Sequence, residues 1–201
     1  ARLQREGYLK RDVQRLVNND RNVFGSCMLK NGDADGMVTG VTRNYDVALQ
    51  DAQMVLDPIP GQAVIGMSMV INRGKTVFIA DTSVTELPGG PELADIAVEA
   101  ARAVQSVGFV PRVAFLSYST FGNPMGERGE KVREAVAILD NMDGIEFEYE
   151  GDMAADVALN PNHWMLYPFS RLSGPANVLV MPAIHAASIS TKLLESMSRA
   201  T

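Results

Sequence analysis

Residues 111–122 read Pro111-Arg112-Val113-Ala114-Phe115-Leu116-Ser117-Tyr118-Ser119-Thr120-Phe121-Gly122, and this stretch decides the fold. Its apolar run stops abruptly at a cluster of hydroxyl residues and a glycine, which predicts a buried parallel strand that opens into a polar loop. In open α/β sheets ligands bind beyond the carboxyl ends of the strands, so these hydroxyls are candidates for hydrogen bonds to a substrate. The alternative interpretation is an ordinary strand-to-helix turn in which the hydroxyls cap the next helix.

Strands and helices alternate along the chain on both sides of this stretch. Runs at 63–71 and 76–80 flank a short turn and predict a β-hairpin, and 176–181 predicts a last buried strand. Apolar positions at helical spacing predict helices from Pro88 to Gly108, over 132–139, over 153–159 and over 188–198. In the last of these we expect Ile189, Leu193 and Met197 to face inward. This alternation predicts an α/β protein, a three-layer αβα sandwich with a largely parallel sheet.

The first sixty residues have a different pattern. It predicts an amphipathic helix through residues 9–17, a strand at 23–30, a glycine-rich loop at 31–36 and a helix at about 44–56. The segment Asp57-Pro58-Ile59-Pro60-Gly61 then breaks the chain, because proline ends helices. We therefore predict a domain boundary there, with residues 1–61 in one domain and residues 62–201 in a second.

Composition excludes several classes of protein. The net charge is -6 and the pI is about 4.9, and no basic cluster with interleaved aromatic residues occurs, so a nucleic-acid partner is not expected. No apolar run approaches the ~20 residues that span a bilayer, and no signal peptide is visible, so we expect no membrane partner and a cytoplasmic location. The single cysteine, Cys27, suits a reducing compartment and is expected to be a core thiol. A start at Ala1 suggests a piece of a longer polypeptide.

Two groups of acidic residues are candidates for metal sites. Asp33 and Asp35 lie in a glycine-rich loop that lacks the further ligands of a calcium-binding EF-hand loop. Glu150, Asp152 and Asp156 follow the alternating segment 145–150, which predicts a half-exposed edge strand with a solvated acidic face. We therefore expect no metal site, and the two histidines have no ligand at metal-binding spacing.

Five motifs in order resemble those of one enzyme family. They are Gly32-Asp33-Ala34-Asp35-Gly36-Met37-Val38, Phe78-Ile79-Ala80-Asp81-Thr82, the stretch at 111–122, Glu150-Gly151-Asp152-Met153 and Ser173-Gly174-Pro175-Ala176-Asn177-Val178-Leu179-Val180-Met181-Pro182. Together they resemble the phosphate acetyl/butyryltransferase family. Val41-Thr42-Arg43-Asn44-Tyr45 extends the likeness to the phosphotransacetylase-like C-terminal domain of bacterial NADP-dependent malic enzymes. The resemblance implies an isocitrate/isopropylmalate dehydrogenase-like fold, with residues 1–61 as part of its first α/β domain.

The resemblance also implies where acetyl-transfer chemistry would lie. Transfer between coenzyme A and phosphate needs a base, positive groups for phosphate and donors for the developing oxyanion. Active members carry an arginine on the helix after the Gly-Asp-Ala-Asp-Gly loop, and Gln50 stands at that position here. A Ser-Arg pair of the family lies beyond Thr201. A neutral glutamine does not hold phosphate as a bidentate arginine does, so no catalytic residues are assigned.

Two functions from different classes follow from the resemblance. The first is a non-catalytic regulatory domain of a malic enzyme that binds acetyl-CoA as effector, with NADP and a divalent metal only in the parent's N-terminal portion. The alternative is a working phosphate acetyl- or butyryltransferase, and a third is a purely structural dimerisation module. The expected acyl-CoA crevice lies between the domains before and after Gly61, and its expected residues are Asp81, Thr82, Ser117, Ser119, Thr120, Phe121, Gly122 and Gln50. A homodimer is expected through the helices at 126–142 and 186–198.

Overall fold

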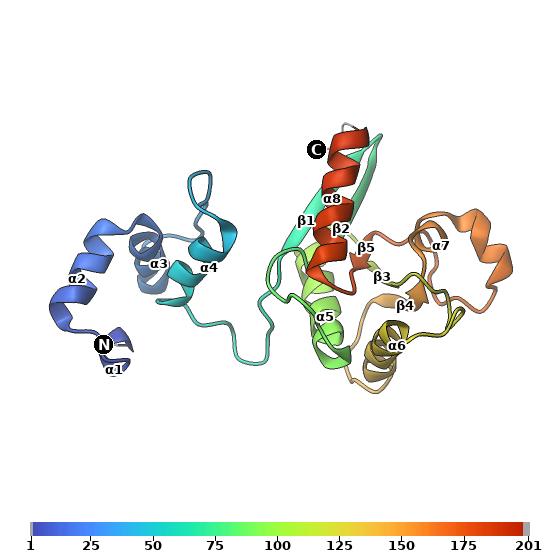
Figure 1. Cartoon of the computed structure of the whole chain (residues 1–201), viewed down its shortest axis with the longest axis horizontal. Helices are drawn as coiled ribbons and strands as arrows, with labels where there is room; N and C mark the ends of the chain where they lie inside the picture. The colour runs from blue at the N-terminus through green and yellow to red at the C-terminus, as the bar shows by residue number, and fades with distance from the viewer. Residues whose placement is uncertain (1, 199–201) are drawn as a thin grey trace. The chain divides into compact units, whose positions relative to one another are not determined.

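The central strand predicted from the sequence is present as β3 (Arg112–Leu116), and the last four of its residues are buried. The computed structural model describes residues 2–198. In the five-stranded sheet the order is β1-β2-β5-β3-β4, and the pairs β2·β5, β5·β3 and β3·β4 are parallel. The prediction of an α/β fold with a largely parallel sheet is confirmed (Figure 1).

The remaining strands lie close to their predicted positions. They are β1 (Met67–Asn72), β2 (Lys75–Ala80), β4 (Glu148–Met153) and β5 (Val178–Val180). β1 and β2 pair antiparallel, which confirms the predicted hairpin. The two turn residues between them, Arg73 and Gly74, have φ angles of 49° and 77°. This left-handed conformation at both positions matches the right-handed twist of paired strands and is typical of a two-residue hairpin loop.

The helices are α1 (Arg2–Arg5), α2 (Lys10–Asn19), α3 (Arg21–Asn31), α4 (Tyr45–Gln53), α5 (Gly90–Ser106), α6 (Glu127–Asp140), α7 (Ala155–Leu159), the 3-10 helix η1 (Pro161–Leu166) and α8 (Ile184–Ser198). The start of α5 shows why the sequence folds this way. Pro91 occupies the first turn, where its missing N–H costs nothing, and the Glu92 carboxylate accepts a hydrogen bond from the Gly89 amide at 3.0 Å.

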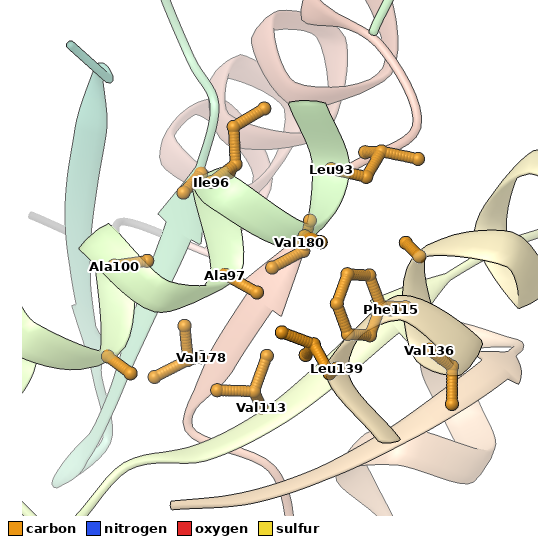
Figure 2. Packing of buried hydrophobic residues seen from close by; sticks show 14 of the residues in the cluster. Leu93, Ile96, Ala97, Ala100, Val113, Phe115, Val136, Leu139, Val178 and Val180 are labelled. Carbon is orange, nitrogen blue, oxygen red and sulfur yellow. The ribbon is translucent and has the colours of Figure 1, made fainter. Parts of the chain in front are cut away.

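Helices cover both faces of the sheet. On one face the side chains of Phe78, Val113 and Phe115 pack against α5 and α6, and Figure 2 shows Phe115 close to Leu139 and Val180. On the other face Ile79 and Leu116 belong to a second buried cluster that includes residues of α7 and α8. Successive residues of a strand point to opposite faces, so β2 and β3 supply both clusters. The three predicted layers are therefore present.

The chain divides into two compact units, Ala1–Pro60 and Gly61–Thr201, so the predicted boundary at residue 61 lies next to the division. The sheet belongs entirely to the second unit. The described part of the first unit is helical, and the predicted strand at 23–30 is wrong because this segment lies within α3. The Asp20 carboxylate caps α3 by accepting hydrogen bonds from the amides of Asn22 and Val23, and Gly32 closes it in the left-handed conformation.

An ion-pair network holds the first unit together. One Arg43 nitrogen lies 2.5 Å from a carboxylate oxygen of Asp20 and 2.5 Å from one of Asp51. The buried Asn22 amide donates a further hydrogen bond to Asp51 at 3.0 Å. The network therefore joins the N-terminus of α3 to α4 through the intervening loop. Cys27, expected in the core, is only half-buried on α3.

The expected orientation of α8 needs correction. Ile189 and Met197 on α8 are not inward, since they are 58% and 82% exposed, and Leu193 is also exposed. The inward side of this segment carries alanines instead, because Ala187 sits against the second cluster. Within residues 2–198 no helix is both long and apolar enough to cross a membrane.

Candidate functional site

The candidate site is the loop Ser117–Gly122, which follows β3 and is held by the Asp152 side chain of β4. Asp152 is fully buried. Its carboxylate accepts a hydrogen bond from the Ser119 hydroxyl and another from the Gly122 amide at 3.0 Å. Arg133 on α6 approaches the same carboxylate at 3.4 Å. Because a buried carboxylate is costly unless it is paired and hydrogen-bonded, these three donors account for its position.

Backbone hydrogen bonds tie the same loop to the end of β4. The Phe121 amide donates to the Asp152 carbonyl at 2.7 Å, and the Ser117 amide donates to the Met153 carbonyl at 3.0 Å. Phe121 has a φ angle of 48°, which turns the chain so that the next amide, that of Gly122, faces Asp152. Three backbone amides of the loop are therefore hydrogen-bonded to β4.

The hydroxyl groups of the loop differ in their availability. Ser119 is buried and bonded to Asp152, and the Thr120 hydroxyl accepts a hydrogen bond from the Ala154 amide at 3.1 Å. Ser117 is half-buried, and its hydroxyl lies 2.9 Å from that of Ser119. Ser117 is therefore the hydroxyl best placed to meet a ligand, while Ser119 and Thr120 support the loop. The expected helix capping by these hydroxyls is not seen, since α6 begins only at Glu127.

Asp81, a predicted site residue at the end of β2, organises its own loop. Its buried carboxylate accepts four backbone hydrogen bonds, from the amides of Gly66, Ser83, Val84 and Thr85 at 2.6 to 3.1 Å. The Thr85 amide donates to Oδ2 and the other three amides donate to Oδ1, so both oxygens accept backbone hydrogen bonds. A direct contact of Asp81 with a ligand therefore stays a prediction, whereas its structural role is visible.

Thr82 and Gln50 complete the predicted set. The Thr82 amide donates to the Gly66 carbonyl at 2.9 Å, and its hydroxyl lies 3.4 Å from that of Ser68. The predicted crevice includes residues after both β2 and β3, but β5 separates these strands in the sheet. The two loops share one rim of the sheet without being neighbours, because all three strands run parallel. Gln50 belongs to the first unit, where it is exposed on α4.

The predicted site residues did not include Asp152, Arg133 or Glu150, although Glu150 and Asp152 belong to one of the five family motifs. β4 is at the edge of the sheet, as predicted, but the expected solvated acidic face is wrong for two residues, since Glu150 is 5% and Asp152 0% exposed. Glu150 is covered because the amide of Arg171 donates to it at 2.9 Å and the guanidinium lies 3.3 Å away. The alternating acidic residues correctly indicated a strand. Their burial depends on tertiary contacts, because Arg171 covers Glu150 and the Ser117–Gly122 loop covers Asp152.

Arg171 also contacts Asp140 and Tyr149. Its guanidinium lies 2.5 Å from Asp140 and 4.7 Å from the ring centre of Tyr149. Burial alone would raise the pKa of Asp140, but hydrogen bonds from Arg171 and Tyr149 outweigh it, so the pKa lies below its ordinary value. Burial and the hydrogen bond to Asp140 raise the pKa of Tyr149. Among residues 2–198, no three His, Cys, Asp or Glu side chains are grouped to hold a metal ion.

Comparison with known proteins identifies the family. The family model described as phosphate acetyl/butaryl transferase matches residues 1–201, the whole chain. The chain belongs to this family. The predicted resemblance is therefore confirmed, and the polar loop after β3 belongs to a phosphate acetyl/butaryl transferase domain.

Relatives within the family include both malic enzymes and acetyltransferases. The NADP-dependent malic enzyme of Rhizobium meliloti is 61% identical over 201 residues, which are 100% of this chain and 26% of that enzyme. The phosphate acetyltransferase of Bacillus subtilis is 29% identical over 96% of this chain and 60% of its own length. The solved EutD phosphotransacetylase from Staphylococcus aureus has a TM-score of 0.82 at 29% identity, over 90% of this chain and 56% of that one. The chain thus spans about a quarter of such a malic enzyme.

Proposed function

We propose that this chain is the phosphotransacetylase-like regulatory part of an NADP-dependent malic enzyme and binds acetyl-CoA without transferring its acetyl group. The observation that carries the proposal is the 61% identity to the Rhizobium meliloti malic enzyme over the whole chain. By the same proposal, NADP and a divalent metal act elsewhere in the parent enzyme, in the oxidative decarboxylation of malate to pyruvate. The parent is proposed to be a cytoplasmic homodimer or higher homo-oligomer.

The rim of the sheet supports the acetyl-CoA part of this proposal. The half-buried Ser117 hydroxyl lies at the carboxyl end of β3, the position where α/β sheets bind ligands. Small polar groups there can hydrogen-bond a thioester or a pantetheine amide without filling the space. Gln50 supports the non-catalytic part, since it replaces the arginine that the family resemblance implies for phosphate.

Calorimetry on the intact protein tests this site. We expect acetyl-CoA to bind, and Ser117→Phe to weaken binding by at least tenfold because the new ring occupies the space beside the hydroxyl. Ser106→Phe is the matched control and should leave binding unchanged. Ser106 is exposed at the C-terminal end of α5, outside the Ser117–Gly122 loop. Absence of acetyl-CoA binding by the intact protein would contradict the sensor function.

Regulation requires a second measurement, because binding alone does not change malate kinetics. Acetyl-CoA must bind one conformation of the parent better than another, and a coupling of about 1–3 kcal/mol changes malate affinity roughly 5–150-fold. We expect such a change in malate kinetics with the intact protein and its loss in Ser117→Phe. Unchanged malate kinetics at saturating acetyl-CoA would leave binding without regulation.

A working phosphate acetyltransferase is the second candidate. The TM-score of 0.82 to the Staphylococcus aureus phosphotransacetylase favours it, as that protein is named for this activity. The assay is formation of acetyl-CoA from acetyl phosphate and coenzyme A by the intact protein. Turnover at ordinary enzyme rates of ~1–10³ s⁻¹ would establish this candidate and overturn the non-catalytic one.

A further inference from the structure

A groove of about 790 Å³ lies on the face of the sheet that carries α7 and α8. Ile79, Leu116 and Leu179, from β2, β3 and β5, line it on the sheet side. Leu159 at the end of α7 and Leu193 on α8 line it from the helices. Its volume lies in the range of small-molecule sites, roughly 300–1,000 Å³. All lining residues belong to the second unit, and Figure 1 labels the elements β2, β3, β5, α7 and α8 that carry most of them.

Polar groups are few in this groove. Ser117, Tyr118, Arg128 and Ser190 contribute to its lining, and the remaining residues are apolar. Arg128 is exposed near the N-terminus of α6 and forms no ion pair with any residue between 2 and 198. One cation beside an otherwise apolar groove is the arrangement expected for a ligand with a hydrocarbon part and one negative end.

Arg128 also lines a second, smaller hollow of about 180 Å³. Lys131 and Glu127 line this hollow too, so its formal charge is positive by one. Pro182, after β5, borders both hollows, which places them next to each other. A negative group bound at Arg128 would therefore be adjacent to a second cation, Lys131.

We infer that the groove binds an amphipathic anion, with an unbranched acyl chain in the apolar part and a carboxylate or phosphate at Arg128. This ligand differs from the acetyl-CoA proposed above, whose acetyl group is too short to fill the groove. Burial of methylene groups drives the binding, and Arg128 sets the orientation. A free fatty acid and a long-chain acyl-CoA share this chemistry, and the experiments below separate them.

Calorimetry with decanoate and dodecanoate, below their micelle concentrations, tests the apolar part on the intact protein. Each added methylene should tighten binding about fourfold, so dodecanoate should bind about fifteenfold more tightly than decanoate. Equal affinities for the two lengths, or no binding of either, would overturn the inference. Lauroyl-CoA in place of dodecanoate separates the two sources: tighter binding of lauroyl-CoA favours the acyl-CoA, and tighter binding of dodecanoate favours the free fatty acid.

Arg128→Gln tests the charged end. It should weaken dodecanoate about two- to fivefold, the range of an exposed ion pair, and leave the neutral dodecanol unchanged. Lys192→Gln on α8 is the matched control: Lys192 is exposed and not part of the groove lining, and its loss removes the same charge. Equal weakening of dodecanoate and dodecanol, or none of either, would exclude Arg128 from the site.

Ser190→Phe on α8 tests the location, because the ring would fill the groove. It should weaken dodecanoate and dodecanol by at least tenfold. This measurement uses no acetyl-CoA, so failure of the acetyl-CoA proposal would not affect its result. Dodecanoate carrying a terminal photoreactive group gives a second measurement on the unaltered protein, and we expect cross-links to α7 and α8. Cross-links confined to other elements would overturn the inference.

A second copy of the chain is the competing occupant. If dodecanoate does not bind and Ser190→Phe converts a dimer to a monomer in sedimentation, then the groove is an interface between copies. If dodecanoate binds without changing the sedimentation of the intact protein, then the groove is a ligand site.

Discussion

The Gly122 amide lies 3.0 Å from the Asp152 Oδ1 atom and donates a hydrogen bond to it, so a loop after one strand is fastened to a side chain of the next. The same carboxylate accepts a bond from the buried Ser119 hydroxyl. Asp152 therefore holds the shape of the loop at which we place the candidate site.

Asp152→Asn should lower the free energy of unfolding by about 1–3 kcal/mol. The substitution keeps the shape of the side chain, but it replaces one carboxylate oxygen by an NH₂ group. This group cannot accept the hydrogen bond that the oxygen accepted. Urea unfolding measures the effect. Asp156→Asn is the control, since that side chain is 68% exposed and its loss should change stability by no more than about 0.5 kcal/mol. Equal effects of both substitutions would mean that the hydrogen bonds of Asp152 contribute nothing.

Leu93→Ala on α5 should destabilise the protein by about 2–5 kcal/mol, because it leaves a cavity in the core that α5 forms with the sheet. Leu87→Ala removes the same atoms from a side chain that is 60% exposed and should have little effect. Thermal or urea unfolding of both variants compares them directly. A cost below about 1 kcal/mol at Leu93 would show that the site collapses to fill the space.

Acid should weaken the first unit through Asp20. Burial alone would raise the pKa of Asp20, but the Val23 amide and the Arg43 guanidinium outweigh it, so the pKa lies below the ordinary 3.8. A depressed carboxylate pKa gives stability that is complete above the unfolded-state pKa and is lost as pH falls through the folded-state pKa. Asp20→Asn keeps a residue able to cap α3 and removes the charge. We expect the free energy of unfolding of this variant to depend less on pH below about 4 than that of the unsubstituted protein. An unchanged pH profile would contradict the role of the ion pair.

Ile189→Glu on α8 should weaken the proposed homodimer. Ile189 is 58% exposed, does not line the groove and belongs to the segment where we expect contact between copies. Burying a glutamate without a partner is costly, so the variant dimer should dissociate at concentrations where the unsubstituted protein remains a dimer. Sedimentation measures this, with Lys192→Glu as a control on the same helix. If the unsubstituted protein is a monomer at micromolar concentration, then the proposed homodimer is wrong.

Most of the correct fold predictions rest on the periodic spacing of apolar residues. Val132, Ala135, Val136 and Leu139 recur at helical spacing, and all four are buried in α6 as expected. The segment 23–30 was wrongly predicted as a strand because its apolar run has no clear period. It is a helix whose ends are capped by Asp20 and Gly32 through local hydrogen bonds. Asp152 was missed for another reason. Its partners are 30 and 33 residues away in the sequence, and alternation alone does not show which face of an edge strand becomes covered.

The strand order has a consequence for how this chain folds as it is synthesised. β5 contains only three residues, yet β2 and β3 pair with it and not with each other. The hairpin and the β3·β4 pair can form early, but the sheet that joins them cannot exist until residues 178–180 have left the ribosome. Until then each half has a strand edge without its partner, and such edges favour aggregation. A nascent chain stalled before residue 178 should therefore depend on chaperones, whereas one stalled well after it should resist protease.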